Sequence, residues 1–234
     1  MKAFQLLQNL LFVDIETVPE WAEWEQVPEK MQLLWEKKAL SIDKEADAAD
    51  LYSKKAGIYA EFGKIIAIGV GYFCLDEASE LSFRVKTFKQ QKEEDLLQAF
   101  HSLLQKPYTL VAHNGKEFDF PYLCRRFFVK GIALPKSLQI QGKKPWGIPH
   151  IDTMEMWTFG DRKSYTSLDL LATILDISSS KGDMEGSKVR DVYYNEKNLE
   201  KIAEYCSNDV VVTARLFLKL KSLPPISEKA IIKV

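Results

Sequence analysis

The sequence predicts a mixed α/β fold, in which a sheet of antiparallel and parallel strands is flanked by helices. Short apolar runs rich in β-branched residues indicate strands, and elsewhere apolar residues recur at helical spacing. In chain order the expected elements are three strands, a helix, a strand and a helix, followed by further helices. No internal repeat or linker interrupts this order, so the sequence predicts one domain over residues 1–234.

Composition narrows the class of protein. The 234 residues are 46% hydrophobic and 12% aromatic, which suffices for one sizeable core. The three cysteines and three histidines are scattered, which argues against a disulfide framework and a zinc site and favours a cytoplasmic location. Neither a signal peptide nor an apolar stretch long enough to span a bilayer is found, so no membrane association is expected.

The net charge of −1 argues against a general polyanion binder. Any contact with nucleic acid therefore has to come from a local basic patch, with the acidic residues elsewhere or bound to metal. The sequence identifies no protein partner.

The first predicted strand, residues 11–19, carries two acids. Its apolar start is typical of a strand buried on both faces, and Pro19 ends it. Because strand side chains alternate between faces, Asp14 and Glu16 point to the same side. At an effective dielectric constant of about 20, two carboxylates roughly 4 Å apart repel by about 4 kcal/mol, and a divalent cation relieves this repulsion. Oxygen ligands favour Mg²⁺ or Mn²⁺. The alternative interpretation is that this stretch is a strand followed by an acidic turn and binds no metal.

Residues 20–62 are predicted to form a helical insertion. Apolar residues at near-helical spacing among many charges indicate two amphipathic helices that cover one edge of the core. Trp21, Trp24 and Trp35 lie in this segment. They could stack on bases, but their interpretation as core residues is favoured.

Two more strands follow the insertion, over residues 64–73 and residues 81–88, with a turn at Asp76 and Glu77 between them. The alternation of the second run suits an antiparallel partner of the first. With the opening strand they are predicted to form a three-strand antiparallel meander.

The middle of the chain is predicted to contain a helix at residues 91–104, a strand at residues 108–112 and a second helix near Pro121. Asp119 stands at the start of that second helix, and taken alone it is interpreted as the helix N-cap. His113 is interpreted as a packing residue. The basic residues of this helix and of the following loop are interpreted as solvated charges: Arg125, Arg126, Lys130, Lys136, Lys143 and Lys144.

The last part of the chain is predicted to be helical around a polar loop. Asp152 is expected to cap a brief helix, and Ser167 a firmer one. The loop at residues 178–183 has too little apolar content to pack. A long helix after Asn195 has a broad apolar face.

Three acid-bearing motifs occur in order along the chain. Asp14 and Glu16 match D-x-E, Asn114, Phe118 and Asp119 match N-x₃-F-D, and Tyr205 and Asp209 match Y-x₃-D. With these motifs the sequence resembles the DEDD superfamily of 3′-to-5′ exonucleases, which have a ribonuclease H-like fold. The tyrosine is typical of its DEDDy branch. Within that branch the sequence is most similar to the proofreading exonuclease domain of family-B DNA polymerases and to a bacterial group of stand-alone predicted exonucleases.

The resemblance implies an enzyme that hydrolyses single-stranded DNA from the 3′ end to nucleoside 5′-monophosphates by a two-metal mechanism. It implies that Asp14 bridges two Mg²⁺ or Mn²⁺ ions. Glu16 and Asp209 are expected to complete the ligands of one ion, and Asp119 to help hold the other. Tyr205 is expected to orient the attacking water rather than deprotonate it, because a phenol with a pKa of about 10 is rarely ionised at pH 7.

Further residues are predicted to contact the nucleic acid. Thr17 and Asn114 adjoin the acids and can hydrogen-bond a terminal 3′-hydroxyl, although satisfied turn residues have the same pattern. Phe118 belongs to the second motif. Lys181 and Lys188, on the polar loop and just beyond it, are expected to contact phosphates.

Two alternative functions stay open at this point. A ribonuclease D-like exoribonuclease would use the same acids, and only contacts at the 2′-hydroxyl separate it from a deoxyribonuclease. An inactive nucleic-acid-binding adaptor is disfavoured because all five acid and tyrosine positions of the motifs are filled.

Overall fold

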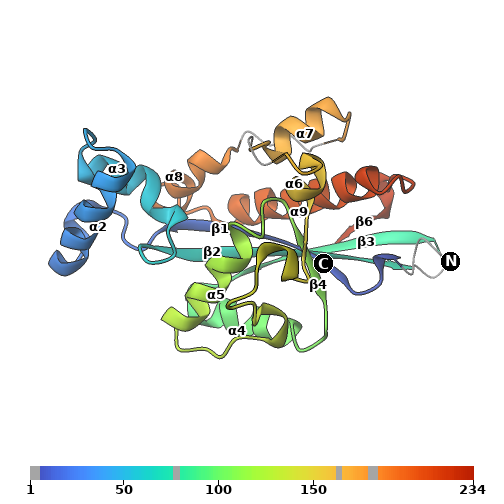
Figure 1. Ribbon diagram of the computed structural model, residues 1–234, viewed down its shortest axis with the longest axis horizontal. Coiled ribbons are helices and arrows are strands. Elements are labelled where there is room, and N and C mark those ends of the chain that lie inside the picture. Colours follow the sequence, from blue (N-terminus) through green and yellow to red (C-terminus); the bar gives the residue numbers. More distant parts are fainter. Residues whose placement is uncertain (1–5, 76–79, 162–164, 179–183) are drawn as a thin grey trace.

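The computed structural model describes residues 6–75, 80–161, 165–178 and 184–234. In this part of the chain one sheet of six strands has the order β5-β4-β1-β2-β3-β6 (Figure 1). The strands are β1 (Leu10–Pro19), β2 (Gly63–Leu75), β3 (Leu81–Lys89), β4 (Thr109–Ala112), β5 (Ile151–Asp152) and β6 (Ile231–Lys233).

The pairing of these strands is mixed. β1 pairs antiparallel with β2, and β2 with β3, whereas the β1–β4, β4–β5 and β3–β6 pairs are parallel. The predicted mixed sheet and the predicted antiparallel meander are therefore confirmed. The turn predicted at Asp76 and Glu77 lies outside the described residues.

Helices cover both faces of the sheet. Figure 1 shows α4 (Glu93–Leu103) and α5 (Asp119–Val129) on one side, and α6 (Thr153–Thr158), α7 (Leu168–Ile174), α8 (Val189–Tyr194) and α9 (Leu199–Leu220) on the other. The long helix α9 contacts β1, β2 and β3, and α6, α7 and α8 pack beside it. This three-layer arrangement encloses β1, the central strand, from both faces.

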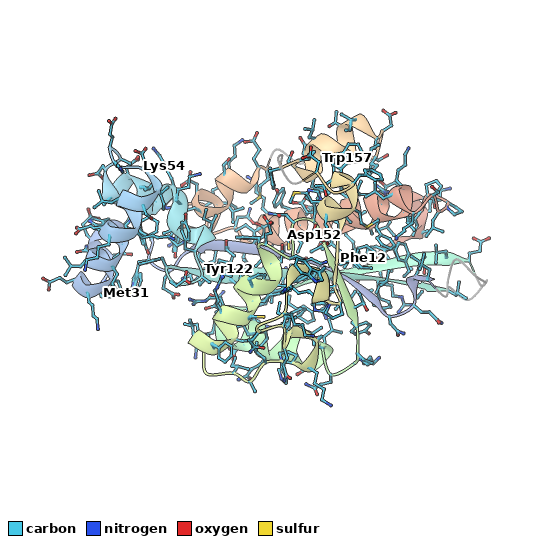
Figure 2. The ribbon with its side chains drawn as sticks, in the orientation of Figure 1. Phe12, Met31, Lys54, Tyr122, Asp152 and Trp157 are labelled. Carbon is cyan, nitrogen blue, oxygen red and sulfur yellow. The ribbon has the colours of Figure 1, made fainter. Side chains whose placement is uncertain are left out.

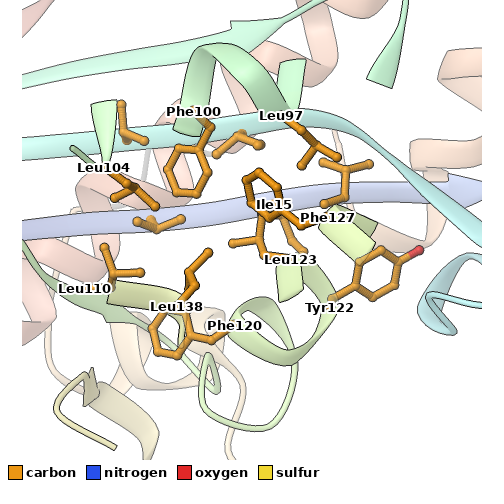
Figure 3. Packing of buried hydrophobic residues seen from close by; sticks show 14 of the residues in the cluster. Ile15, Leu97, Phe100, Leu104, Leu110, Phe120, Tyr122, Leu123, Phe127 and Leu138 are labelled. Atoms are coloured by element: carbon orange, nitrogen blue, oxygen red, sulfur yellow. The ribbon is translucent and has the colours of Figure 1, made fainter. Parts of the chain in front are cut away.

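The core on the α4 and α5 side is built around the inward residues of β1. In Figure 3, Ile15 lies among Leu97, Phe100, Leu123 and Phe127, and all of these side chains are buried. Because strand residues alternate, the neighbours of Ile15 on either side face α9 instead. The core thus fixes which face of β1 carries its acids.

The insertion forms a cluster of its own beside the sheet. Its helices α2 (Glu29–Ile42) and α3 (Ala48–Lys55) pack around Trp35, which is fully buried and donates a hydrogen bond of 2.8 Å to the carbonyl of Ala48. Trp21 and Trp24 pack against the same cluster, so the interpretation of these tryptophans as core residues is confirmed. Figure 2 shows α2 and α3 at one end of the molecule, away from its middle.

Arg126 is buried rather than solvated, so its interpretation as a solvated charge is wrong. Its guanidinium bonds Glu93 of α4 at 2.5 and 2.8 Å, Glu20 at 2.8 Å and the carbonyl of Ala60 at 2.8 Å. Glu93 also accepts a hydrogen bond of 2.8 Å from the backbone of Ile65. A charge with this many partners is tolerated inside a protein, and here it ties α5 to α4 and to the end of β1.

Several short elements were not predicted. β5 has 2 residues, β6 has 3 and α8 has 6. The two predicted caps are present: Asp152 accepts a hydrogen bond of 2.9 Å from the backbone of Met154 in α6, and Ser167 accepts one of 3.2 Å from the backbone of Leu170 in α7. Among the described residues, no helix has the length and apolar character needed to cross a membrane.

Candidate active site

The side of β1 that faces α9 carries Asp14 and Glu16. Phe12 lies on this side, and its ring packs edge-on against Phe217 of α9 at a centroid distance of 5.6 Å. With a residue period of two, both acids follow Phe12 on the same face. A carboxylate oxygen of Asp14 and one of Glu16 lie within 4.8 Å of each other. The prediction that the two acids share one face is confirmed.

Helix α9 approaches the sheet closely at Gly69 of β2. Gly69 is the cross-strand partner of Asp14, and a Cβ there would lie 2.8 Å from Val210 Cγ2 and 2.9 Å from Cys206 Sγ. Cys206 in turn donates a hydrogen bond of 3.5 Å to the carbonyl of Asp14. The missing side chain at Gly69 lets α9 bring its residues 205–209 next to the acids of β1.

Tyr205 and Asp209 lie one turn apart on α9 and share one face of it. Burial raises the pKa of the Tyr205 phenol above its usual value, and the negative charges of Asp209 and Glu16 add to this effect. The phenol therefore stays protonated at neutral pH and donates a hydrogen bond to Asp209.

Asp119 is the first residue of α5, and its carboxylate points at β1. Oδ1 accepts a hydrogen bond of 3.2 Å from the backbone of Ile15, the residue between the two strand acids. The N-cap position belongs to Phe118 and has no side-chain cap. The interpretation of Asp119 as an N-cap is therefore wrong, because a donor from a distant strand takes the carboxylate oxygen.

Together these residues form an acidic cluster, defined as Asp14, Glu16, Asp119 and Asp209. Burial is the largest cause of the raised pKa of each member, and it raises the pKa of Asp119 to about 7 and that of Asp209 to about 6. For Asp14 the charges of the other three members raise the pKa further. Within the described residues, no lysine or arginine forms an ion pair with the cluster. The cluster therefore needs protons or metal cations to be stable at neutral pH.

Asp14 also has an oxygen available to a cation. In the described part of the chain its Oδ2 is buried and has no hydrogen-bond partner. Leaving such an acceptor without a partner costs roughly 1–3 kcal/mol, and more for a charged group. A bound cation would remove this cost.

Asp152 holds the loop that leads to Asp119, a role that the sequence did not indicate. Its carboxylate accepts hydrogen bonds from the backbone of Asn114 at 2.9 Å and of Lys116 at 3.0 Å, in addition to capping α6 through Met154 at 2.9 Å. Asn114 has a left-handed φ of 59°, which this anchoring stabilises. An aspartate before a short helix is a common cap, so no local signal pointed to its second role.

A second pair with Y-x₃-D spacing, Tyr165 and Asp169, lies near the acidic cluster. The charge of Asp119 contributes, after burial, to the raised pKa of Tyr165, and the charge of Asp169 raises the pKa of Asp209. Because α7 begins at Leu168, Tyr165 and Asp169 do not share a helical face. Sequence analysis missed this pair, and its spacing alone does not distinguish it from the pair on α9.

The residues predicted to contact nucleic acid lie in different parts of the structure. The Thr17 hydroxyl bonds the phenol of Tyr122, and the ring of Phe118 lies 5.4 Å from the Tyr122 ring. Lys188 is exposed at the end of the 3₁₀ turn Gly186–Lys188. That turn lies over Tyr205, whose hydroxyl is 3.9 Å from the Cβ position of Gly186.

Of the remaining two contacts, Asn114 has a buried Oδ1 without a hydrogen-bond partner in the described part of the chain. Lys181 lies outside the described residues. The structure thus gathers the five acid and tyrosine positions of the motifs at one site and brings the Lys188 turn over it.

Comparison with known proteins gives one family and one fold. A family model described as "Predicted 3′-5′ exonuclease related to the exonuclease domain of PolB" matches residues 58–228, which include the second and third motifs. The family B DNA polymerase from the hyperthermophilic archaeon Pyrobaculum calidifontis is structurally similar, with a TM-score of 0.50 and 13% sequence identity over 90% of this chain. The chain spans only 24% of that polymerase. At this identity the likeness concerns the fold, and it supports the predicted ribonuclease H-like arrangement.

Proposed function

Because this chain belongs to the family of predicted 3′-5′ exonucleases related to the exonuclease domain of PolB, we propose that it digests single-stranded DNA from the 3′ end with two divalent cations. The products are nucleoside 5′-monophosphates, released one at a time. The observation that carries this proposal is the acidic cluster, whose carboxylates come from β1, α5 and α9 and have no basic partner among the described residues. The proposed exonuclease domain covers residues 1–234, with residues 20–62 as a helical insertion.

The acidic cluster fits Mg²⁺ or Mn²⁺ by the chemistry of its donors. Hard oxygen ligands suit both ions, and Asp14 offers a buried oxygen without a partner. Asp14 is proposed to contact both ions, with Glu16 and Asp209 on the first and Asp119 on the second. When bound, two such ions acidify the attacking water and stabilise the charge on the leaving 3′-oxygen.

Cys206 is close to the acids but is assigned no ligand role. Its sulfur lies within 4.8 Å of oxygens of Asp14 and Glu16, and burial raises the pKa of its thiol well above the usual range. A protonated thiol is a poor ligand for these ions. The Cys206 thiol instead donates a hydrogen bond to the Asp14 carbonyl. Cys206 therefore packs α9 against β1.

Tyr205 is proposed to position the attacking water. Its raised pKa keeps the phenol protonated, so it cannot act as the base at neutral pH. The hydrogen bond to Asp209 fixes the direction of the ring and leaves the hydroxyl oxygen as an acceptor for water. A Tyr205→Phe change is accordingly expected to lower kcat with little change in KM.

The terminal nucleotide is proposed to contact residues around the acidic cluster. Asn114 Oδ1 can accept a hydrogen bond from the 3′-hydroxyl, and Thr17 and Phe118 border the same end of β1 and α5. Lys188, on the turn that lies over Tyr205, is proposed to contact a phosphate, as is Lys181. An exonuclease needs such contacts because the acids alone could also cleave within a strand.

The test is digestion of matched 5′-labelled DNA and RNA oligomers with Mg²⁺ or Mn²⁺. We expect a ladder that shortens from the 3′ end, faster on DNA, and no cleavage of a circular single strand or of a 3′-phosphorylated one. Asp209→Asn should abolish the ladder, whereas Asp95→Asn, which changes an exposed aspartate of α4, should not.

Three results would change the assignment. Faster digestion of RNA would indicate an exoribonuclease. Cleavage of the circular strand that depends on Asp209 would indicate an endonuclease. Full activity of Asp209→Asn would remove the acidic cluster from the mechanism.

A further inference from the structure

One long segment of the chain has basic residues and no acids. Residues 120–151 contain two arginines and four lysines but neither aspartate nor glutamate, in a chain whose net charge is −1. The segment starts directly after Asp119 and ends directly before Asp152. In the chain, this positively charged segment therefore lies between two residues of the candidate active site.

Four of the six basic residues are free to meet a ligand. Arg126 and Lys130 are engaged with Glu93, whereas Arg125, Lys136, Lys143 and Lys144 are exposed, and no described acid pairs with them. An arrangement of unpaired cations of one sign creates a local field that attracts polyanions. The net charge of the whole chain conceals this field.

An exposed aromatic side chain accompanies these cations. Trp146 is 69% exposed, and the ammonium of Lys144 lies 5.2 Å from the centre of one of its rings. An indole exposed to this degree is unusual in a packed protein, and it offers a flat face to a nucleobase. Together Arg125, Lys136, Lys143, Lys144 and Trp146 are called the basic loop surface.

The basic loop surface is held against α5 by specific contacts. The Cys124 thiol donates a hydrogen bond of 3.3 Å to the carbonyl of Leu138, two residues after Lys136. At the other end of the loop, the His150 ring packs on Phe120 at 5.0 Å and bonds the carbonyl of Ser137 at 2.8 Å. The loop is therefore an ordered part of the fold.

The surface also reaches the loop at the acidic cluster. Burial lowers the pKa of the His150 ring, and the charges of Lys143 and Lys116 add to this effect, so both lysines lie near the ring. Lys116 belongs to the loop of Asn114 that Asp152 anchors beside Asp119. A strand whose 3′ end lies at the acidic cluster can thus continue onto the basic loop surface.

We propose that the basic loop surface binds the single strand on the 5′ side of the nucleotide being removed, with the cations on its phosphates and Trp146 stacked on a base. This inference rests on the proposed function. The surface favours nucleic acid over an acidic protein because cations beside an exposed indole match phosphates beside a base.

The first test measures binding without turnover. In EDTA, we compare a Lys136→Ala/Lys143→Ala/Lys144→Ala variant with a Lys30→Ala/Lys37→Ala/Lys44→Ala control, which removes three exposed lysines of the insertion and changes the net charge equally. Binding is measured by fluorescence anisotropy with a labelled 20-nucleotide strand, and the first variant should bind at least tenfold more weakly. The slope of log Kd against log salt concentration should also decrease by about 2, because each of the three lost phosphate contacts accounts for about 0.7 of that slope. Equal weakening of both variants, or of neither, would overturn the proposal.

Trp146 is tested separately from the charges. Trp146→Ala should weaken binding about fivefold or more, and Trp146→Phe should restore most of it because a phenyl ring still stacks. Displacement of the strand by polyglutamate at equal charge concentration would overturn the assignment to nucleic acid.

The second test separates this proposal from the proposed function. For the triple-lysine variant, KM for the 20-nucleotide strand should rise about tenfold at unchanged kcat, while hydrolysis of a dinucleotide should not change. A variant that loses dinucleotide hydrolysis would show damage at the acidic cluster and refute the surface. A chain that binds as described but hydrolyses nothing would refute the exonuclease proposal and leave the surface standing.

Discussion

Asp14 occupies the most crowded position of the acidic cluster. Three other carboxylates raise its pKa, and no cation among the described residues balances it. Asp14→Ala is expected to abolish nuclease activity, because Asp14 is the residue proposed to contact both ions, while the melting temperature in EDTA stays the same or rises slightly. Rate and melting temperature are measured on the same preparation. Substantial activity in a pure, folded variant would contradict the assignment.

The raised pKa of Asp119 predicts that the stability of the protein depends on pH. Its pKa is about 7 in the folded protein against a usual 3.8, so the folded state keeps a proton that the unfolded state releases. Its contribution to stability is complete below about pH 4 and is lost as the pH rises to about 7. The side chain of Asp119→Asn cannot ionise but can still accept a hydrogen bond from the Ile15 backbone. In EDTA, the free energy of unfolding of the variant minus that of the native chain should therefore increase by at most about 4 kcal/mol from pH 4 to pH 7. Denaturant titrations at pH 4 and pH 7 measure this gain, and a constant difference would contradict it.

The contact between α9 and β2 sets the position of Tyr205 and Asp209. Gly69→Ala would place a Cβ 2.8 Å from Val210 Cγ2 and 3.1 Å from the Cys206 carbonyl, so helix and strand must move apart. Overpacking of this kind costs about 1–3 kcal/mol. We expect a lower melting temperature and, below it, a reduced kcat.

Gly147→Ala is the matched control for this change. Gly147 lies in the 3₁₀ turn Pro145–Gly147, and a Cβ there meets nothing within 4 Å. Its melting temperature should be close to that of the native chain. An equal effect of both substitutions would show that the close approach at Gly69 does not matter.

The same elements show what could be read from the sequence. The 22 residues of α9 repeat the helical period many times, and the strands of the meander are 9 residues or longer, so patterns identified them. β5 and β6, with 2 and 3 residues, are too short to have a pattern.

Contacts between distant residues explain the errors at the site. Asp119 was interpreted as a cap because its real donor, Ile15, is 104 positions away, and Arg126 as solvated because its partners are 33 and 106 positions away. The motifs identified the acids that the structure brings together, but a single sequence does not state which backbone group each acid meets. The second role of Asp152 was missed for the same reason.

At the scale of the whole molecule, the proposed metal binding by the acidic cluster predicts a gain in folding stability. Ions that bind only the folded state stabilise it by RT ln(1 + [L]/Kd), which is about 2.7 kcal/mol when the concentration is 100 times Kd. Millimolar Mn²⁺ should therefore raise the melting temperature of the native chain, and Asp14→Ala should lose most of this rise. Thermal scans with and without Mn²⁺ measure both, and equal shifts would place the ion elsewhere.

The central position of β1 also has a consequence for synthesis on the ribosome. β1 is the first strand to emerge, but β2, β4 and α9, which enclose it, emerge only with residues 63–75, 109–112 and 199–220. Until then its acids stay hydrated and away from Asp209, and its apolar residues have no partner strands or helices to pack against. The nascent chain thus exposes an apolar strand before its partners are made, and the acidic cluster assembles only after α9 has been synthesised.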